Sequence, residues 1–167
     1  MIVILMGVSG SGKTTIGMLL AQRMQTVFAD ADDFHSVANK AKMAAGHALN
    51  DEDRQPWLLT LNTLLSGWFE SGESGVLACS ALKDSYRKIL IRGMPKEAIT
   101  FVLLDGSREL IAERLARRQD HYMNPALLDS QLTTLETPTE ALRVVNDLPP
   151  EDVVRIIMNF LELHGVK

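Results

Sequence analysis

The chain has 167 residues, 46% of them hydrophobic, with one cysteine and a formal net charge of −4 at pH 7. This length and apolar content suit a single compact domain over residues 1–167, and the acidic balance argues against a nucleic-acid partner, because such partners are held by an excess of Lys and Arg. The lone Cys79 excludes an intramolecular disulfide and favours a reducing, cytoplasmic location, and the apolar run before Gly7 is too short for a signal peptide or a membrane span, so we expect no membrane association.

The first predicted elements are a buried strand over residues 2–6, a glycine-rich loop and a helix over residues 13–24. The loop, residues 7–14, reads GVSGSGKT and fills every fixed position of the phosphate-binding pattern G-x-x-x-x-G-K-[ST]. In such a loop the backbone N–H groups and the positive end of the helix bind phosphate, Lys13 reaches the β- and γ-phosphates, and the Thr14 hydroxyl holds Mg²⁺. The predicted ATP-binding residues of this segment are Gly7, Val8, Ser9, Gly10, Ser11, Gly12, Lys13, Thr14 and Thr15.

Three acidic residues, Asp30, Asp32 and Asp33, follow the second predicted strand, residues 27–29. Ligands of a parallel sheet gather at the carboxyl ends of its strands, where a carboxylate can accept a proton from a substrate hydroxyl or hold Mg²⁺ through water. Asp is also a preferred cap of helix N-termini, so a structural interpretation of these residues stays open.

A long segment, residues 30–71, separates the second and third predicted strands, and we expect its main helix to start at Pro56, because Pro favours the first helical turn. Large apolar residues at helical spacing in that helix are predicted to be core: Trp57, Leu61, Leu64 and Trp68. The acids at 51–53 suit the caps and dipole of its N-terminus. Arg54 is a cation where the dipole favours anions, so it either lies in solvent or binds an anionic substrate.

The rest of the chain continues the alternation of strands and helices. Strands are expected at residues 75–79, 99–104 and 143–145, and helices at 84–92, 107–118 and 150–163. Together these elements predict an α/β P-loop NTPase fold, with an approximately five-stranded, mainly parallel sheet, helices on both faces and a small lid.

Arg114 and Arg118 lie four residues apart on one face of the expected helix at 107–118. Like charges at this spacing repel unless an anion lies beside them, and triphosphate oxygens supply that anion. We therefore predict that both bind ATP and that Arg118 offsets charge on the transferring phosphoryl group, although solvated arginines fit the same pattern. Arg117, four residues after Glu113, fits an ordinary surface ion pair.

Motifs beyond the phosphate-binding loop give the chain a specific resemblance. They are DADDFH at residues 30–35, LNDEDR at 49–54, PWL at 56–58, CSALK at 79–83, YR at 86–87 and LLDSQ at 127–131. With these motifs the chain resembles the small gluconokinases over nearly its whole length, on a fold similar to that of shikimate and nucleoside monophosphate kinases. The resemblance implies that Mg²⁺-dependent transfer of the ATP γ-phosphate to the 6-hydroxyl of D-gluconate gives 6-phosphogluconate and ADP.

The resemblance also implies residue roles. Asp32 becomes the carboxylate that orients the attacking hydroxyl and accepts its proton, which makes Lys13, Asp32 and Arg118 the expected catalytic residues. A forked guanidinium suits the carboxylate of gluconate, and mixed donors and acceptors suit its hydroxyls. The residues implied for the substrate pocket are His35, Lys42, Arg54, Lys83, Arg87, His121 and Gln131. Mg²⁺ is expected on Thr14, with Asp30 or Asp32 holding it through water.

Two stretches depart from the family pattern: Ser36 replaces a usual proline, and an altered sequence with an extra residue precedes Pro125 in the lid, which we expect at approximately residues 118–128. Family members are often dimers, so the resemblance allows a homodimer. The alternatives are another small-molecule kinase of the same fold, acting on shikimate, a nucleotide or a different sugar acid, and a nucleotide-dependent switch that transfers no phosphate.

Overall fold

The computed structural model describes residues 1–117 and 125–163, in which five parallel strands form one sheet in the order β2-β3-β1-β4-β5. The strands are β1 (Ile2–Met6), β2 (Val27–Asp30), β3 (Gly75–Ala78), β4 (Ile99–Asp105) and β5 (Leu142–Val145). Each begins and ends within one residue of its predicted bounds, so the α/β class with a parallel sheet is confirmed.

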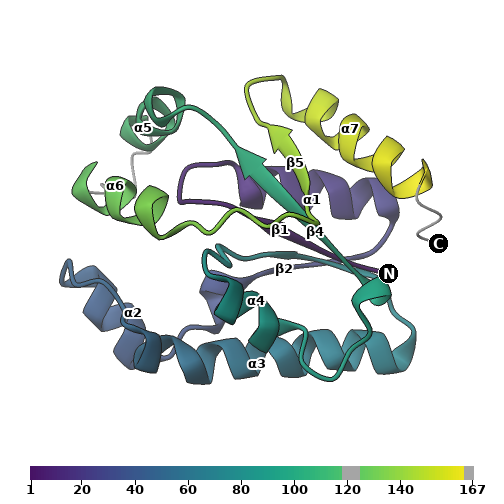
Figure 1. The fold of residues 1–167 in the computed structure, drawn as a ribbon, viewed down its shortest axis with the longest axis horizontal. Coiled ribbons are helices and arrows are strands. Elements are labelled where there is room, and N and C mark those ends of the chain that lie inside the picture. The colour runs from purple at the N-terminus through teal and green to yellow at the C-terminus, as the bar shows by residue number, and fades with distance from the viewer. Residues whose placement is uncertain (118–124, 164–167) are drawn as a thin grey trace.

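Helices cover both faces of this sheet, with α1 and α7 on one side and α3 and α4 on the other (Figure 1). The helices are α1 (Lys13–Met24), α2 (Val37–Ala44), α3 (Asp51–Ser71), α4 (Asp84–Leu90), α5 (Arg108–Ala116), α6 (Pro125–Thr134) and α7 (Pro150–Leu163), with short 3₁₀ turns η1 (Ala31–Phe34) and η2 (Lys96–Ala98). In β1, Val3 and Leu5 pack toward α1 and α7, while Ile2 and Ile4 pack toward α3 and α4. Burial on both faces explains why β1 is apolar at every position.

The start of α3 differs from the prediction, because the helix begins at Asp51 and Pro56 lies inside it. Asn50 and Asp53 form a reciprocal capping box, in which each side chain accepts a hydrogen bond from the other residue's backbone N–H. This pair satisfies backbone N–H groups at the start of the helix, so it sets the helix start at Asp51, upstream of Pro56. The cost is one missing helical hydrogen bond at Pro56.

The predicted apolar stripe of α3 is core: Trp57, Leu61 and Trp68 are buried, and Leu64 packs against the same cluster. Ser36, the departure from the family pattern, has a local reason: its hydroxyl caps α2 by accepting the Asn39 N–H at 3.1 Å. The helix predicted at 84–92 ends earlier, at Leu90, and residues 150–163 form α7 as predicted.

Helix α6 is an element that the sequence pattern did not reveal, and it includes residues 125–128 of the expected lid. Leu128 belongs to a third, smaller apolar cluster with Val8 of the glycine-rich loop, Leu82 after β3, and Ile111 and Leu115 of α5. The loop after β1 and the loop after β3 therefore share one packing partner. Among the described residues, no helix is long and apolar enough to cross a membrane.

Candidate active site

The glycine-rich loop, residues 7–12, joins β1 to α1 at the carboxyl edge of the sheet. Gly12 has φ of 95°, and a Cβ there would lie 2.4 Å from Nδ2 of Asn146, so only glycine fits. The Lys13 ammonium donates to the carbonyl oxygens of Gly7 and Val8, at 3.0 Å each. It is thus held against the loop, while Thr14 and Thr15 are exposed in the first turn of α1.

Asn146, directly after β5, fixes this loop from the far end of the sequence, and our sequence analysis missed it. It is buried, and its Nδ2 donates to the Ser11 carbonyl oxygen at 2.6 Å. Its own carbonyl accepts a hydrogen bond of 2.6 Å from Nη2 of Arg114 on α5. Arg114 therefore supports the nucleotide loop indirectly, by holding Asn146 at the end of β5. The available signal was a polar residue at the carboxyl end of the last strand.

Asp30 and Asp32 lie beside the loop at the end of β2. The Thr14 hydroxyl donates to Oδ2 of Asp30 at 2.7 Å, and Oδ1 of Asp30 accepts the Asp32 N–H at 3.1 Å. Asp30 thus caps η1, which confirms the structural interpretation of this acid, and it also contacts the first turn of α1; its role at Mg²⁺ stays a prediction. The Asp32 carboxylate itself is 88% exposed and faces His35 across 3.9 Å.

The oxygens of Thr14 and Asp30 are the donor type that Mg²⁺ prefers, and they already lie at contact distance from each other. No group of three or more His, Cys, Asp or Glu side chains that could hold a metal occurs in the part of the chain that the structure describes. This donor set therefore fits an ion that is held partly by the nucleotide's phosphates, as is usual for Mg²⁺.

His35 is buried against Trp57, with ring centroids 4.3 Å apart and planes 15° from parallel. Burial lowers the pKa of His35, with Asp32 opposing and Arg54 and Lys40 adding to the shift. Its Nδ1 is buried and has no hydrogen-bond partner among the described residues. An unpaired buried nitrogen costs about 1–3 kcal/mol, and in the neutral ring one nitrogen donates a hydrogen bond while the other accepts one.

Two cations gather on Tyr86 of α4, at the start of α3. Arg54 lies 5.7 Å and Lys83 5.3 Å from the centre of the tyrosine ring. Lys83 also donates to both carboxylate oxygens of Asp51, at 3.0 and 3.1 Å, and the Tyr86 hydroxyl donates to the same carboxylate. These bonds lower the pKa of Asp51, mainly through Tyr86 and then Lys83.

Arg54 itself donates to the Leu49 carbonyl at 2.5 Å and approaches the Tyr86 hydroxyl at 3.4 Å. It has no carboxylate at ion-pair distance within residues 1–117 and 125–163. Asp51 and Tyr86 are site residues that we did not predict. Asp51 was interpreted only as a helix-start acid, and Tyr86 only as part of a family motif.

Arg87 holds the loop after β3. It is buried, and Nη1 donates to the carbonyl oxygens of Ala81 and Leu82, at 2.9 and 3.2 Å. Ala81 has φ of 43°, a left-handed conformation that costs energy for a residue with a Cβ and needs such support. The structure therefore places Arg87 under the site as a support for this loop. The loop lies against the nucleotide loop, because the Gly7 N–H donates to the Ser80 carbonyl at 3.3 Å.

Gln131 on α6 contacts the nucleotide loop. Its Oε1 accepts the Ser9 N–H at 2.7 Å and its Nε2 donates to the Ser9 hydroxyl at 3.2 Å. Just beyond α6, Glu136 accepts the Asp84 N–H at 2.6 Å, and its own N–H donates to the Leu82 carbonyl at 2.8 Å. Helix α6 and the segment just after it are thus bonded to both loops that meet at the site.

The other predicted site residues fall into two groups. Lys42 on α2 forms an ion pair of 2.5 Å with Asp53 on α3, so its charge serves the contact between these helices. Arg118 and His121 lie outside the described residues. Arg117 pairs with Glu113, which confirms the surface ion pair expected for it.

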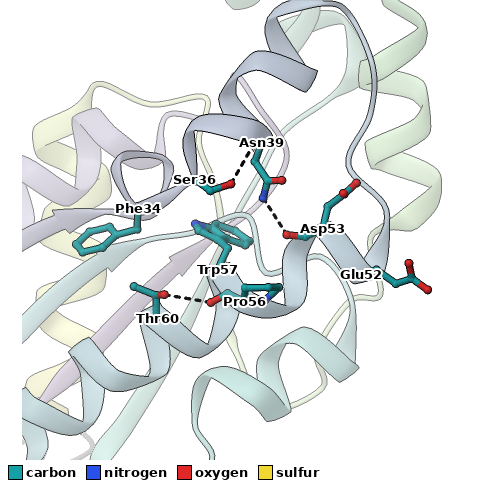
Figure 2. Close-up of a pocket in the computed structure, with 8 residues that line it drawn as sticks. All are labelled: Phe34, Ser36, Asn39, Glu52, Asp53, Pro56, Trp57 and Thr60. Atoms are coloured by element: carbon teal, nitrogen blue, oxygen red, sulfur yellow. Dashed lines mark hydrogen bonds between the residues drawn. The ribbon is translucent and has the colours of Figure 1, made fainter.

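A cavity of about 340 Å³ lies between η1, α2 and α3, and Figure 2 shows the residues that line it. Its lining consists of Phe34, Ser36, Asn39, Glu52, Asp53, Pro56, Trp57 and Thr60. Asp32, His35 and Arg54 do not line it, and Trp57 is the residue it shares with the His35 stack. The cavity is therefore separate from Asp32, His35 and the cations on Tyr86, although Asp53, the partner of Lys42, lines it.

The sequence model of the shikimate kinase family matches residues 9–146. Among curated proteins, the chain is 42% identical to a probable gluconokinase of Dictyostelium discoideum, over 97% of this chain and 86% of the relative. It is 44% identical to the thermosensitive gluconokinase of Escherichia coli strain K12, over 93% of this chain and 78% of the relative.

Solved structures give the same grouping. A gluconokinase from Sinorhizobium meliloti 1021 superposes with a TM-score of 0.85 at 38% identity, covering 96% of this chain and 90% of that one. A shikimate kinase from Aquifex aeolicus superposes with a TM-score of 0.64 at 22% identity, covering 99% of both chains. The second likeness, at low identity, supports the fold alone.

Proposed function

The chain belongs to the shikimate kinase family and, within it, to the gluconokinases, and on this premise we propose how its own residues phosphorylate gluconate. It is a kinase that transfers a phosphoryl group from ATP to gluconate. The specific acceptor atom we propose is the 6-hydroxyl of D-gluconate, which gives 6-phosphogluconate. Shikimate and nucleotides are disfavoured as acceptors, because the relatives that share 41–47% of residues are gluconokinases.

At the nucleotide end, we assign the triphosphate to the loop of residues 7–12 together with Lys13, Thr14 and Thr15. As in kinases generally, ATP acts with a divalent metal ion, and we propose Mg²⁺ bound to Thr14, with Asp30 as the nearest carboxylate. Mg²⁺ supplies positive charge that offsets the phosphate oxygens during transfer. The 2.7 Å contact between Thr14 and Asp30 is the support for choosing Asp30 over Asp32.

At the reacting end, Asp32 orients the 6-hydroxyl and accepts its proton as the oxygen bonds to the γ-phosphorus and the bond to the bridging oxygen of ADP breaks. Its exposure at the end of β2 leaves it accessible to an acceptor. His35 beside it is suited to a neighbouring hydroxyl through its neutral ring. We keep Arg114, Arg118 and His121 as proposed members of the site on the lid side, with a lid at approximately residues 118–128.

The single observation that carries the acceptor assignment is the pair of cations on Tyr86. Arg54 and Lys83 lie at the start of α3 and after β3, and the β3 loop is bonded to the nucleotide loop through Gly7 and Ser80. A guanidinium without a carboxylate partner is the group that best binds the carboxylate of an aldonic acid. A neutral sugar has no carboxylate, so it cannot form this ion pair with the guanidinium.

Lys42 and Arg87 contribute indirectly in this proposal, since Lys42 ties α2 to α3 and Arg87 supports the β3 loop. Gln131 acts on Ser9 of the nucleotide loop. We propose a single domain that works in the cytoplasm with ATP and gluconate as partners, and without nucleic acid or a membrane.

The acceptor assignment is tested by measuring ADP release with D-gluconate, shikimate and D-glucose, and by identifying the phosphorylated position with ³¹P NMR. Arg54→Met should raise KM for gluconate about 10- to 100-fold, the strength of a hydrogen-bonded charge, and leave KM for ATP within about twofold. Arg23→Met is the control, because Arg23 pairs with Glu151 on the opposite face of the sheet. Equal use of glucose, or an unchanged KM for gluconate in Arg54→Met, would refute the assignment.

A further inference from the structure

Asp51 binds the donors that we assign to the substrate carboxylate. Its Oδ1 accepts from Lys83 at 3.0 Å and from the Tyr86 hydroxyl, and its Oδ2 lies 3.1 Å from the same ammonium. The Asp51 side chain is 65% exposed, and that of Lys83 is 32% exposed. A carboxylate supplied by the chain itself therefore lies on these donors, in a position that solvent and ligands can reach.

The charges of this cluster are not balanced. Two cations, Arg54 and Lys83, flank one tyrosine ring, and Asp51 is the one carboxylate within ion-pair distance of either of them in residues 1–117 and 125–163. The group of Arg54, Lys83 and Asp51 thus keeps a net positive charge, which attracts a ligand carboxylate. A ligand carboxylate that enters between Arg54 and Lys83 meets Asp51 as a like charge and as a competitor for the same hydrogen bonds.

We propose that Asp51 holds the place of the substrate carboxylate and that gluconate binds by exchange, its C1 carboxylate replacing Asp51 on Lys83 and Tyr86. This inference rests on the proposed function, which brings the gluconate carboxylate to these donors. Asp51 returns to Lys83 and Tyr86 when the product leaves. It sets the affinity of the site without contacting the reacting atoms, and is therefore a positioning residue.

The exchange has a consequence for turnover. 6-Phosphogluconate carries the same carboxylate as gluconate and a phosphate in addition, so it would bind the cations at least as well as the substrate does. An internal carboxylate that competes for Lys83 weakens both complexes by the same factor. Asp51 thereby lowers the affinity for substrate and speeds the release of product.

Asp51→Asn tests the competition, because it removes the charge and keeps the shape. We expect KM for gluconate to fall about two- to fivefold, the strength of an exposed ion pair, and inhibition by 6-phosphogluconate to tighten by the same factor. KM for ATP should not change. Glu52→Gln is the matched control: it removes the same charge from the same helical turn, and Glu52 is exposed without an ion pair among the described residues, so KM for gluconate should stay constant.

A second test uses the unaltered protein and does not depend on a variant that folds. The Tyr86 and Lys83 bonds lower the pKa of Asp51 in the free protein. Exchange breaks these bonds, so the pKa of Asp51, followed by ¹³C NMR of the labelled carboxyl group, should rise when gluconate saturates the site. A value that stays low with gluconate bound would overturn the proposal.

Four further outcomes are decisive. A higher KM for gluconate in Asp51→Asn means that Asp51 orients the cations, and an equal change in Glu52→Gln means a general effect of charge; either one overturns the exchange. In a Lys83→Met background, where the Tyr86 hydroxyl is the remaining donor to Asp51, Asp51→Asn should lower KM for gluconate by a smaller factor, and an undiminished fall also contradicts the exchange. If the unaltered protein does not phosphorylate gluconate at all, the proposed function fails, whatever Asp51 does.

Discussion

Removing the Asn146 side chain should damage the nucleotide loop from a distance. In Asn146→Ala the buried Ser11 carbonyl loses its 2.6 Å hydrogen bond, and the space beside Gly12 opens. A buried acceptor left unpaired costs about 1–3 kcal/mol. For a domain of this size each kcal/mol shifts Tm by about 2–4 °C, so we expect Tm to fall by roughly 2–12 °C. A looser loop should also lower kcat/KM for ATP about tenfold or more, because misplaced groups lose alignment.

The control for Asn146→Ala is Asn62→Ala. Asn62 also uses Nδ2 to join distant segments, donating to the Leu90 and Arg92 carbonyls at 2.9 and 3.0 Å, but it lies on α3 away from the nucleotide loop. Asn62→Ala should lower Tm about as much as Asn146→Ala does and leave kcat/KM for ATP unchanged. Thermal unfolding and steady-state kinetics measure both effects. If the two variants lose ATP efficiency equally, or Asn146→Ala loses none, the reasoning about Asn146 is wrong.

Three other predictions concern single groups of the site and core. Asp32→Asn should lower kcat about 10²-fold with KM for ATP nearly unchanged, and a kcat within about threefold of the parent removes Asp32 as the base. Burial lowers the pKa of His35 from 6.5, so on acidification the unfolded chain binds the proton before the folded protein does, and the free energy of unfolding falls. Chemical unfolding at about pH 7.5 and 5.5 should therefore show a smaller fall in that free energy for His35→Gln than for the parent. An equal fall contradicts this prediction. Burial raises the pKa of the Cys79 thiol to about 12, so mass spectrometry should detect alkylation by iodoacetamide at about pH 8 only after denaturation, and rapid modification of the folded protein would count against a buried Cys79.

The fold and the nucleotide end were predictable because their signals are local. The apolar run of β1, the glycine pattern and the helix after it are adjacent in sequence, and each depends on backbone rules that hold without tertiary context. The same local reasoning failed at Pro56, where two N-terminal signals lay within one turn and the capping box was the stronger.

The acceptor end was predictable only in part, because its contacts join distant segments. The helix dipole and the resemblance indicated Arg54, and the resemblance indicated Lys83, but nothing in the sequence places Asp51 on Lys83, 32 residues away, or Asn146 on Ser11, 135 residues away. Arg87 likewise has a contact that the sequence did not reveal. Its guanidinium supports the strained backbone at Ala81, and the substrate binding that the family motif implied for it stays a prediction.

Helix α6 and the residues just after it connect the nucleotide loop to the loop after β3, through Gln131 on Ser9 and through the Glu136 contacts with Leu82 and Asp84. For protein engineering, this makes the loop after β3 a poor unit to transplant alone. A graft of that loop from a kinase with another acceptor would meet a foreign helix and shift Ser9 along with it. Redesign of acceptor preference should therefore carry residues 125–136 as one cassette with the β3 loop.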